Sequence, residues 1–117
     1  MATPNNFRNR ISYKEIKLTA HARQRAEERT GLTSTDEVRK LAISARYNGI
    51  NLHGLNVDNY SKFNLDLNTY RILKGHFARH TNSERLYYYK DKVFIFCGND
   101  AKTLKTIINI PKKEMAS

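Results

Sequence analysis

Cysteine, tryptophan, proline and glycine are scarce in this chain of 117 residues, which contains one Cys, no Trp, two Pro and five Gly. The single Cys97 excludes an intramolecular disulfide and a cysteine zinc cluster, and we expect it to be a small buried apolar residue. The longest apolar run, Val93 to Cys97, is far shorter than the roughly 18 residues that span a bilayer. The N-terminal residues also lack the apolar stretch of a signal peptide. We therefore expect a soluble, cytoplasmic protein with no membrane partner.

Negative charge is the next deficit, since 11 Asp and Glu residues stand against 21 Lys and Arg residues and leave a formal net charge of +10 at pH 7. Residues 1–49 and 50–117 carry equal surpluses, so the positive charge belongs to the whole chain rather than to one basic tail. Neutralising phosphates releases counterions, which favours a nucleic-acid partner. RNA is the expected partner and DNA the alternative. An acidic protein partner, and a basic surface that only keeps the protein soluble, remain open.

Two helices are predicted in the first half of the chain. Thr19 can cap a helix over residues 20–30, which ends where Gly31 adopts a left-handed conformation at little cost. Capping-box spacings begin at both Thr33 and Ser34, and the apolar stripe that follows them predicts a second helix that ends by Gly49.

The second half changes from helical to strand-like periodicity. Residues 50–63 have no stable period and indicate a long connection or a short irregular strand. Residues 64–80 carry a helical stripe and predict a third helix. Residues 85–90, 92–97 and 103–110 alternate or run apolar and are rich in Tyr, Phe, Ile and Val, which predicts three strands. Because their connections are short, the strands are expected to be antiparallel.

These elements predict one α+β domain in which N-terminal helices pack on a C-terminal antiparallel β-meander. We expect residues 1–16 to be a flexible lead-in, residues 17–111 to be the domain and residues 112–117 to be a tail. The chain is too short for two self-sufficient cores, which excludes a multidomain enzyme.

The first helix carries the densest group of chemically active side chains. His21, Arg25, Glu28 and Arg29 follow at offsets of 0, +4, +7 and +8, so they share one face. His21 lies in the first turn, where the helix dipole favours a neutral imidazole that can act as a base. The alternative interpretation is a solvated face on which Glu28 and the arginines form salt bridges.

A second group combines basic and aromatic residues, which suits unpaired bases that stack on rings while the backbone lies on positive charges. Its basic members are Arg71, Lys74, His76, Arg79, His80 and Arg85, and its aromatic members are Tyr70, Phe77, Tyr87, Tyr88 and Tyr89. The alternative is that the rings belong to the core. His76 and His80 have zinc-ligand spacing, but no Cys or carboxylate in register accompanies them, so we expect no metal.

Residues 18–29 read LTAHARQRAEER and residues 105–111 read KTIINIP, and a second capped helix and an Arg before the strands lie between them. This arrangement resembles small toxin-like proteins that have an HAxxRxxxR helix and belong to the barnase, EndoU, colicin and RelE-type ribonuclease superfamily. The similarity covers about residues 17–111. It implies a RelE/barnase-like fold and a metal-independent endoribonuclease, in a toxin–antitoxin, secreted-toxin or phage setting. His21, Arg25 and Arg29 match the helix motif, and Arg85 and Thr106 match the later positions.

Cleavage of RNA by its own 2′-hydroxyl needs a base, an acid and cations that stabilise the phosphorane, and it needs no cofactor. We expect His21 to be the base, with Glu28 as its alternative, and His80 to be the acid. Arg25, Arg29 and Arg85 are the expected phosphate binders. The expected nucleic-acid-binding residues are Arg23, Arg71, Lys74, His76, Arg79, Tyr88 and Thr106. The rival hypothesis is a non-catalytic nucleic-acid-binding or host-interaction protein that uses the same basic surface. An acidic inhibitor or antitoxin would fit the same surface.

Overall fold

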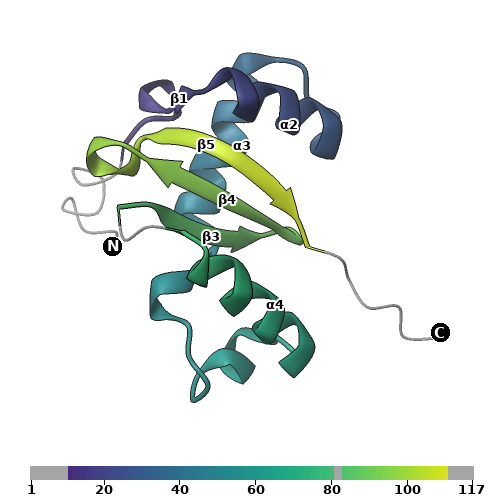
Figure 1. The fold of residues 1–117 in the computed structure, drawn as a ribbon. Helices are drawn as coiled ribbons and strands as arrows, with labels where there is room; N and C mark the ends of the chain where they lie inside the picture. The colour runs from purple at the N-terminus through teal and green to yellow at the C-terminus, as the bar shows by residue number, and fades with distance from the viewer. Residues whose placement is uncertain (1–10, 81–82, 111–117) are drawn as a thin grey trace, which may run out of the picture.

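A five-stranded sheet forms the centre of the protein in the computed structural model, which describes residues 11–80 and 83–110 (Figure 1). The strand order is β1-β5-β4-β3-β2. The strands are β1 (Lys17–Leu18), β2 (Ile50–Asn51), β3 (Arg85–Tyr89), β4 (Lys92–Cys97) and β5 (Thr103–Asn109). The three predicted strands, β3 to β5, are present and antiparallel. The α+β class is confirmed, but the sheet is mixed rather than a pure antiparallel meander, because β1 pairs in parallel with β5. Two-residue strands leave no periodicity in a sequence, so β1 was not predicted, and β2 lies in residues 50–63, for which a short irregular strand was one of two alternatives.

The helices of the described chain are α2 (Ala20–Thr30), α3 (Thr35–Asn48) and α4 (Leu67–Ala78). The bounds of α2 agree with the prediction: the Thr19 hydroxyl accepts a hydrogen bond from the backbone N–H of Ala22 at 2.9 Å, and Gly31 takes a φ of +79°. The Ser34 hydroxyl caps α3, and the Asp66 carboxylate caps α4. Short local signals therefore determine where each helix begins.

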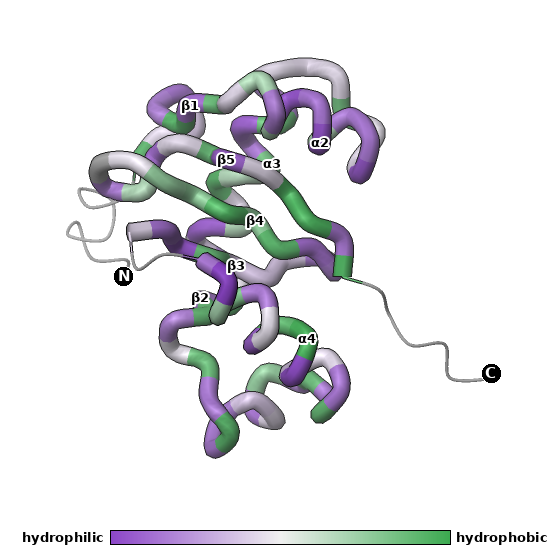
Figure 2. The backbone as a smooth tube through the Cα atoms, viewed as in Figure 1, coloured by the Kyte–Doolittle hydropathy of each residue, from purple (hydrophilic) through white to green (hydrophobic). Residues whose placement is uncertain are grey.

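Helices cover both faces of the sheet, with α2 and α3 on one side and α4 on the other (Figure 1). The prediction had placed the sheet over the helices without a second helical layer. Small residues, Ala22, Ala26, Ala42 and Ala45, let α2 and α3 approach the sheet closely. Leu73 of α4 belongs to the core on the opposite face. Because β4 is covered on both sides, its residues 93–96 are all buried, and Figure 2 shows this hydrophobic stretch between the layers.

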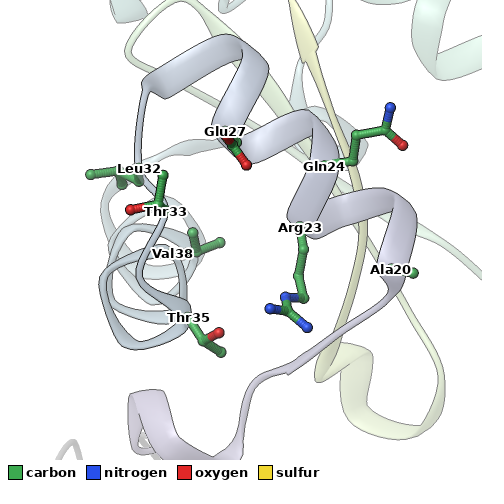
Figure 3. A pocket seen from close by; sticks show the side chains of 8 residues that line it. All are labelled: Ala20, Arg23, Gln24, Glu27, Leu32, Thr33, Thr35 and Val38. Atoms are coloured by element: carbon green, nitrogen blue, oxygen red, sulfur yellow. The ribbon is translucent and has the colours of Figure 1, made fainter.

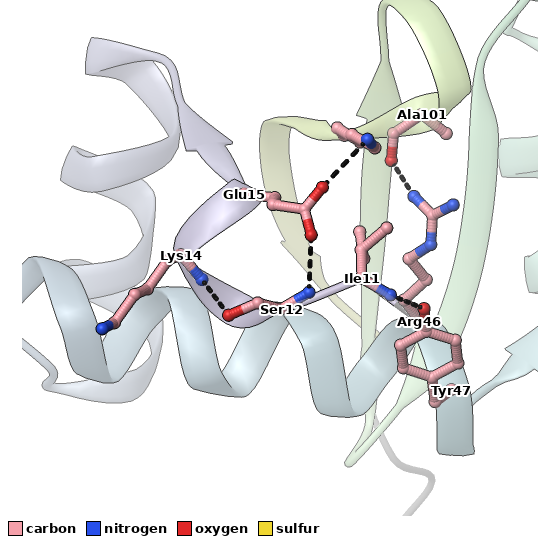
Figure 4. A network of polar contacts seen from close by, with 8 residues as sticks. Ile11, Ser12, Lys14, Glu15, Arg46, Tyr47 and Ala101 are labelled. Atoms are coloured by element: carbon pink, nitrogen blue, oxygen red, sulfur yellow. Dashed lines mark hydrogen bonds and ion pairs between the residues drawn. The ribbon is translucent and has the colours of Figure 1, made fainter. Parts of the chain in front are cut away.

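Residues 11–16 are part of the folded domain, although the sequence analysis assigned them to a flexible lead-in. Ile16 is completely buried, and the backbone N–H of Ile11 donates to the Tyr47 hydroxyl at 2.6 Å (Figure 4). Glu15 closes a capping box with Ser12 and accepts a hydrogen bond from Lys102 at 3.0 Å. Residues 1–10 and the predicted tail 112–117 lie outside the described residues. Within residues 11–80 and 83–110, no helix has both the length and the apolar character needed to cross a membrane.

Candidate nucleic-acid interface

The polar row of α2 is aligned by the helix itself. Ala22 and Ala26 are buried against the sheet, so His21, Arg25 and Glu28 lie on a flank of the helix. The Arg25 guanidinium donates to His21 Nε2 at 3.3 Å and to Glu28 Oε1 at 2.7 Å. This network joins the candidate base to a cation, and it also contains the salt bridge that the solvated-face interpretation predicts.

Glu28 is held in its ionised form by its neighbours. The hydrogen bond from Arg25 lowers the pKa of Glu28, and a second hydrogen bond from Gln24 lowers it further. The two donors occupy different oxygens, since Gln24 reaches Oε2 at 3.1 Å and Arg25 reaches Oε1. A carboxylate whose oxygens already accept hydrogen bonds is a weak base, so this geometry favours Glu28 as a positioning residue for Arg25.

Both ends of α2 are attached to the exposed edge of β5. Strand β1 covers this edge only at Thr103 and Leu104. Beyond β1, the Thr19 hydroxyl donates to the carbonyl of Lys105 at 2.9 Å, and Arg29 donates to the carbonyl of Ile107 at 2.9 Å. Thr106, named from the family resemblance, lies between these two anchoring points. The α2 row therefore runs along β5 in a fixed register.

A second cluster joins the end of α4 to the sheet through a buried carboxylate. Glu84 is the one buried charged residue of the described chain, with 7% of its surface exposed. Its Oε1 lies 2.8 Å from His80 Nδ1, and its Oε2 accepts a hydrogen bond from the Lys105 ammonium. The Lys105 hydrogen bond lowers the pKa of Glu84, and the His80 contact adds to this effect while burial opposes it. The same hydrogen bond raises the pKa of Lys105.

Lys105 contacts both the cap residue of α2 and the carboxylate of the second cluster. The register of β5 shifts there, because Leu104 pairs with Phe96 and Thr106 pairs with Ile95, which leaves Lys105 as the extra residue of a β-bulge. The carbonyl of Lys105 accepts the hydrogen bond from the α2 cap, and its ammonium binds Glu84. The bulge therefore connects the start of the His21 helix with the carboxylate that binds His80.

The remaining basic residues of the second group lie on α4, directly after it or at the start of β3, and in the described part of the chain no hydrogen bond or ion pair links them to the α2 row. Lys74 donates to the carbonyl of Leu55 at 3.3 Å and lies over the Phe77 ring at 5.0 Å. Burial is the main reason that the pKa of His76 is lowered, and the charge of Arg79 adds to it. Arg79, like Arg71 and Arg85, is exposed.

The tyrosines of β3 contribute mainly to the cores. Tyr87 is buried and meets Phe96 edge to face, with ring centroids 5.7 Å apart. Tyr88 is half-buried on the α4 side, and its hydroxyl donates to Asp91 at 3.1 Å. Burial, together with this hydrogen bond, raises the pKa of Tyr88 to about 12. Tyr87 is therefore a core residue, as the alternative interpretation expected, and the Tyr88 hydroxyl forms a hydrogen bond within the protein.

Arg23 lies on the other flank of α2, beside a pocket of about 240 Å³ between α2 and α3 (Figure 3). Glu27 of α2 and the hydroxyls of Thr33 and Thr35 line the same pocket. Arg23 is therefore separated from the row that contains Arg25.

Sequence reasoning missed Glu84 and Lys105. The i, i+4 spacing of His80 and Glu84 was a usable signal, whereas the contact with Lys105 joins residues 21 positions apart. Across residues 11–80 and 83–110, no group of three or more His, Cys, Asp or Glu residues is placed to hold a metal ion. Comparisons with protein-family models, curated proteins and solved structures found no match for this chain.

Proposed function

We propose that the protein is a metal-independent endoribonuclease that cleaves single-stranded RNA along the α2–β5 edge. The observation that carries the proposal is the pairing of His80 with the buried carboxylate of Glu84, beside the bulge on which α2 is anchored. A histidine held by a buried carboxylate has a fixed orientation, which positions its other ring nitrogen for proton transfer. The net charge of +10 supports an RNA partner.

His21 is the proposed base. Its Nε2 accepts the hydrogen bond from Arg25, so this nitrogen carries no proton and can take one from the ribose 2′-hydroxyl. Arg25 then releases His21 and turns to the phosphate. The 2′-oxygen forms a bond to phosphorus while the bond to the 5′-oxygen breaks.

His80 is the proposed acid, and it gives its proton to the departing 5′-oxygen. Glu84 holds Nδ1 and leaves Nε2 for this transfer. Arg25 stabilises the phosphorane, whereas Arg29 donates one N–H to the Ile107 carbonyl and offers its other donors to a neighbouring phosphate of the RNA. Exposed Arg85 binds a flanking phosphate. The products are a 2′,3′-cyclic phosphate and a free 5′-hydroxyl.

The test is incubation of the full chain with labelled single-stranded RNA in EDTA, beside the same sequence as DNA, followed by analysis of the product ends. We expect cyclic phosphate from RNA and no cleavage of DNA. The His21→Ala and His80→Ala variants should each lose about 10²–10⁴ in rate. His53→Ala is the matched control, since His53 is exposed and packs against Phe77 of α4.

Unchanged cleavage in the double variant His21→Ala, His80→Ala would refute the assignment of both histidines. A complete lack of cleavage, with RNA and DNA retained in a salt-sensitive complex, would replace the ribonuclease with a non-catalytic nucleic-acid-binding protein.

A further inference from the structure

A second pocket lies at the far end of the α2 row from His21. It has a volume of about 320 Å³, within the size range of pockets that hold small ligands. Arg29, Lys90 and Lys92 supply its charged groups, and Leu32, Leu41 and Phe94 supply its apolar floor. We call it the Lys90 pocket.

All charged side chains that line the Lys90 pocket are positive. The described residues that line it include three cations and no carboxylate. Asp91, which follows Lys90 in the chain, accepts a hydrogen bond from Tyr88 on the α4 side of the sheet. Cations gathered around one cavity repel one another, so an anion in the cavity is favoured.

The turn that presents Lys90 has an unusual backbone for its residues. Lys90 and Asp91 connect β3 to β4 with φ values of +51° and +63°, which is the left-handed region that Gly and Asn normally occupy in such turns. Two left-handed residues make a tight hairpin in which Lys92 pairs with Tyr89. Lys90 itself lies over the Tyr89 ring, 5.5 Å from its centroid. The hairpin therefore holds two lysines beside the end of α2.

The apolar floor favours a ligand that is more than a bare anion. Leu32 and Leu41 are only half-buried and line the pocket together with the three cations. A ligand that covers this surface and also neutralises the cations combines an apolar or flat part with an anionic group. A nucleotide has both parts.

Arg29 connects the Lys90 pocket to the proposed site. It reaches the carbonyl of Ile107 and also lines the pocket. Eight residues separate it from His21, which is about 12 Å along a helix. A chain that follows the α2 row from His21 therefore arrives at the pocket with a neighbouring nucleotide rather than the cleaved one.

We propose that the Lys90 pocket binds a nucleotide of the RNA next to the cleavage point, with its phosphate on the cations and its base on the leucines. This inference rests on the proposed function, because it takes RNA as the ligand.

The first test is an NMR titration of the full chain with uridine 3′-monophosphate and, separately, with inorganic phosphate. The amides of Thr30, Leu32, Leu41 and Lys92 are expected to shift with the mononucleotide, which should bind about tenfold more tightly than phosphate because it also covers the leucines. Equal affinities would show a cation cluster that binds any anion, and no shift at these amides would exclude binding. Either outcome overturns the inference.

The second test measures RNA binding by fluorescence anisotropy in the double variant Lys90→Gln, Lys92→Gln. Its affinity should fall about tenfold, and the slope of log K against log salt should decrease by about 0.7, which is one phosphate contact on a single strand. The control is Lys14→Gln, Lys62→Gln, which removes the same charge from two exposed lysines elsewhere.

The outcomes separate the two proposals. Normal cleavage with equal RNA affinities in the two double variants would overturn the pocket and leave the ribonuclease intact. Mononucleotide binding in the pocket without any RNA cleavage would leave the pocket as a nucleotide site and refute the ribonuclease.

Discussion

The α2 row and the His80 cluster use the same residue types in opposite surroundings. Each joins a histidine, a glutamate and a cation, through Arg25 and Glu28 in the row and through Lys105 and Glu84 in the cluster. The side chain of Glu28 is 44% exposed, whereas that of Glu84 is 9% exposed. Water and salt compete for Glu28 more than for Glu84, although the Lys105 side chain is itself 49% exposed. We therefore expect a phosphate to rearrange the row more easily than the contact between His80 and Glu84.

The difference in exposure between the two glutamates matches the different roles of the two networks in the proposed reaction. Arg25 has to leave His21 and turn to the phosphate, which an exposed ion pair permits at little cost. His80 has to keep one orientation throughout, which a buried carboxylate provides. Substitutions that remove the charge of a residue in either network test this difference directly.

Among substitutions that compare the two networks without removing a histidine, the largest effect is expected for Glu84→Gln, which keeps the shape of the side chain and removes its charge. Lys105 and His80 then lose their buried anion, so the free energy of unfolding should fall by about 1–3 kcal/mol. RNA cleavage should fall about 10-fold to 100-fold because His80 loses its orienting partner. Urea denaturation and the rate of cleavage measure the two effects.

Glu28→Gln is the matched control on the exposed network, and it should change the stability little. The rate of cleavage under conditions in which both variants are fully folded distinguishes positioning from general destabilisation. Under those conditions Glu84→Gln should still cleave RNA more slowly than Glu28→Gln, because His80 has lost the partner of its Nδ1. Equal losses of stability and of cleavage rate in Glu84→Gln and Glu28→Gln would contradict the expected difference between the α2 row and the His80 cluster.

The next effect is the acid dependence of stability. The pKa of Glu84 is lower in the folded chain than the ordinary value of 4.5, so its contribution is complete above about pH 4.5 and is lost as the pH falls through the lowered pKa. The free energy of unfolding of the wild-type protein should therefore exceed that of Glu84→Gln at neutral pH, and this difference should shrink as the pH becomes acidic. Urea denaturation at pH 7 and pH 3 measures this, and a constant difference would contradict it.

Local signals made much of the fold predictable. The α2 helix could be assigned at both ends because Thr19 and Gly31 act on adjacent backbone groups. The side of the sheet that α4 covers could not be predicted, because Leu73 would form the same apolar stripe against either face.

The candidate site was predictable only where its residues share a helix. Spacing alone aligned His21 with Arg25. The cluster depends on the bulge that turns Lys105 toward Glu84 across β4, and no local pattern encodes that contact. The bulge also places Lys105 in contact with both Glu84 and the cap residue of α2.

The smallest expected effect is on the salt dependence of RNA binding, and it compares one cation from each network. Arg25 is exposed and exchanges its partners with a phosphate, so Arg25→Gln should lower the slope of log K against log salt by about 0.7. The Lys105 ammonium is already neutralised by buried Glu84, so Lys105→Gln should lower the slope by less. Anisotropy titrations over a salt series measure both slopes. A larger change for Lys105→Gln would show that RNA displaces Glu84 from Lys105, and the buried cluster would then be the part that rearranges.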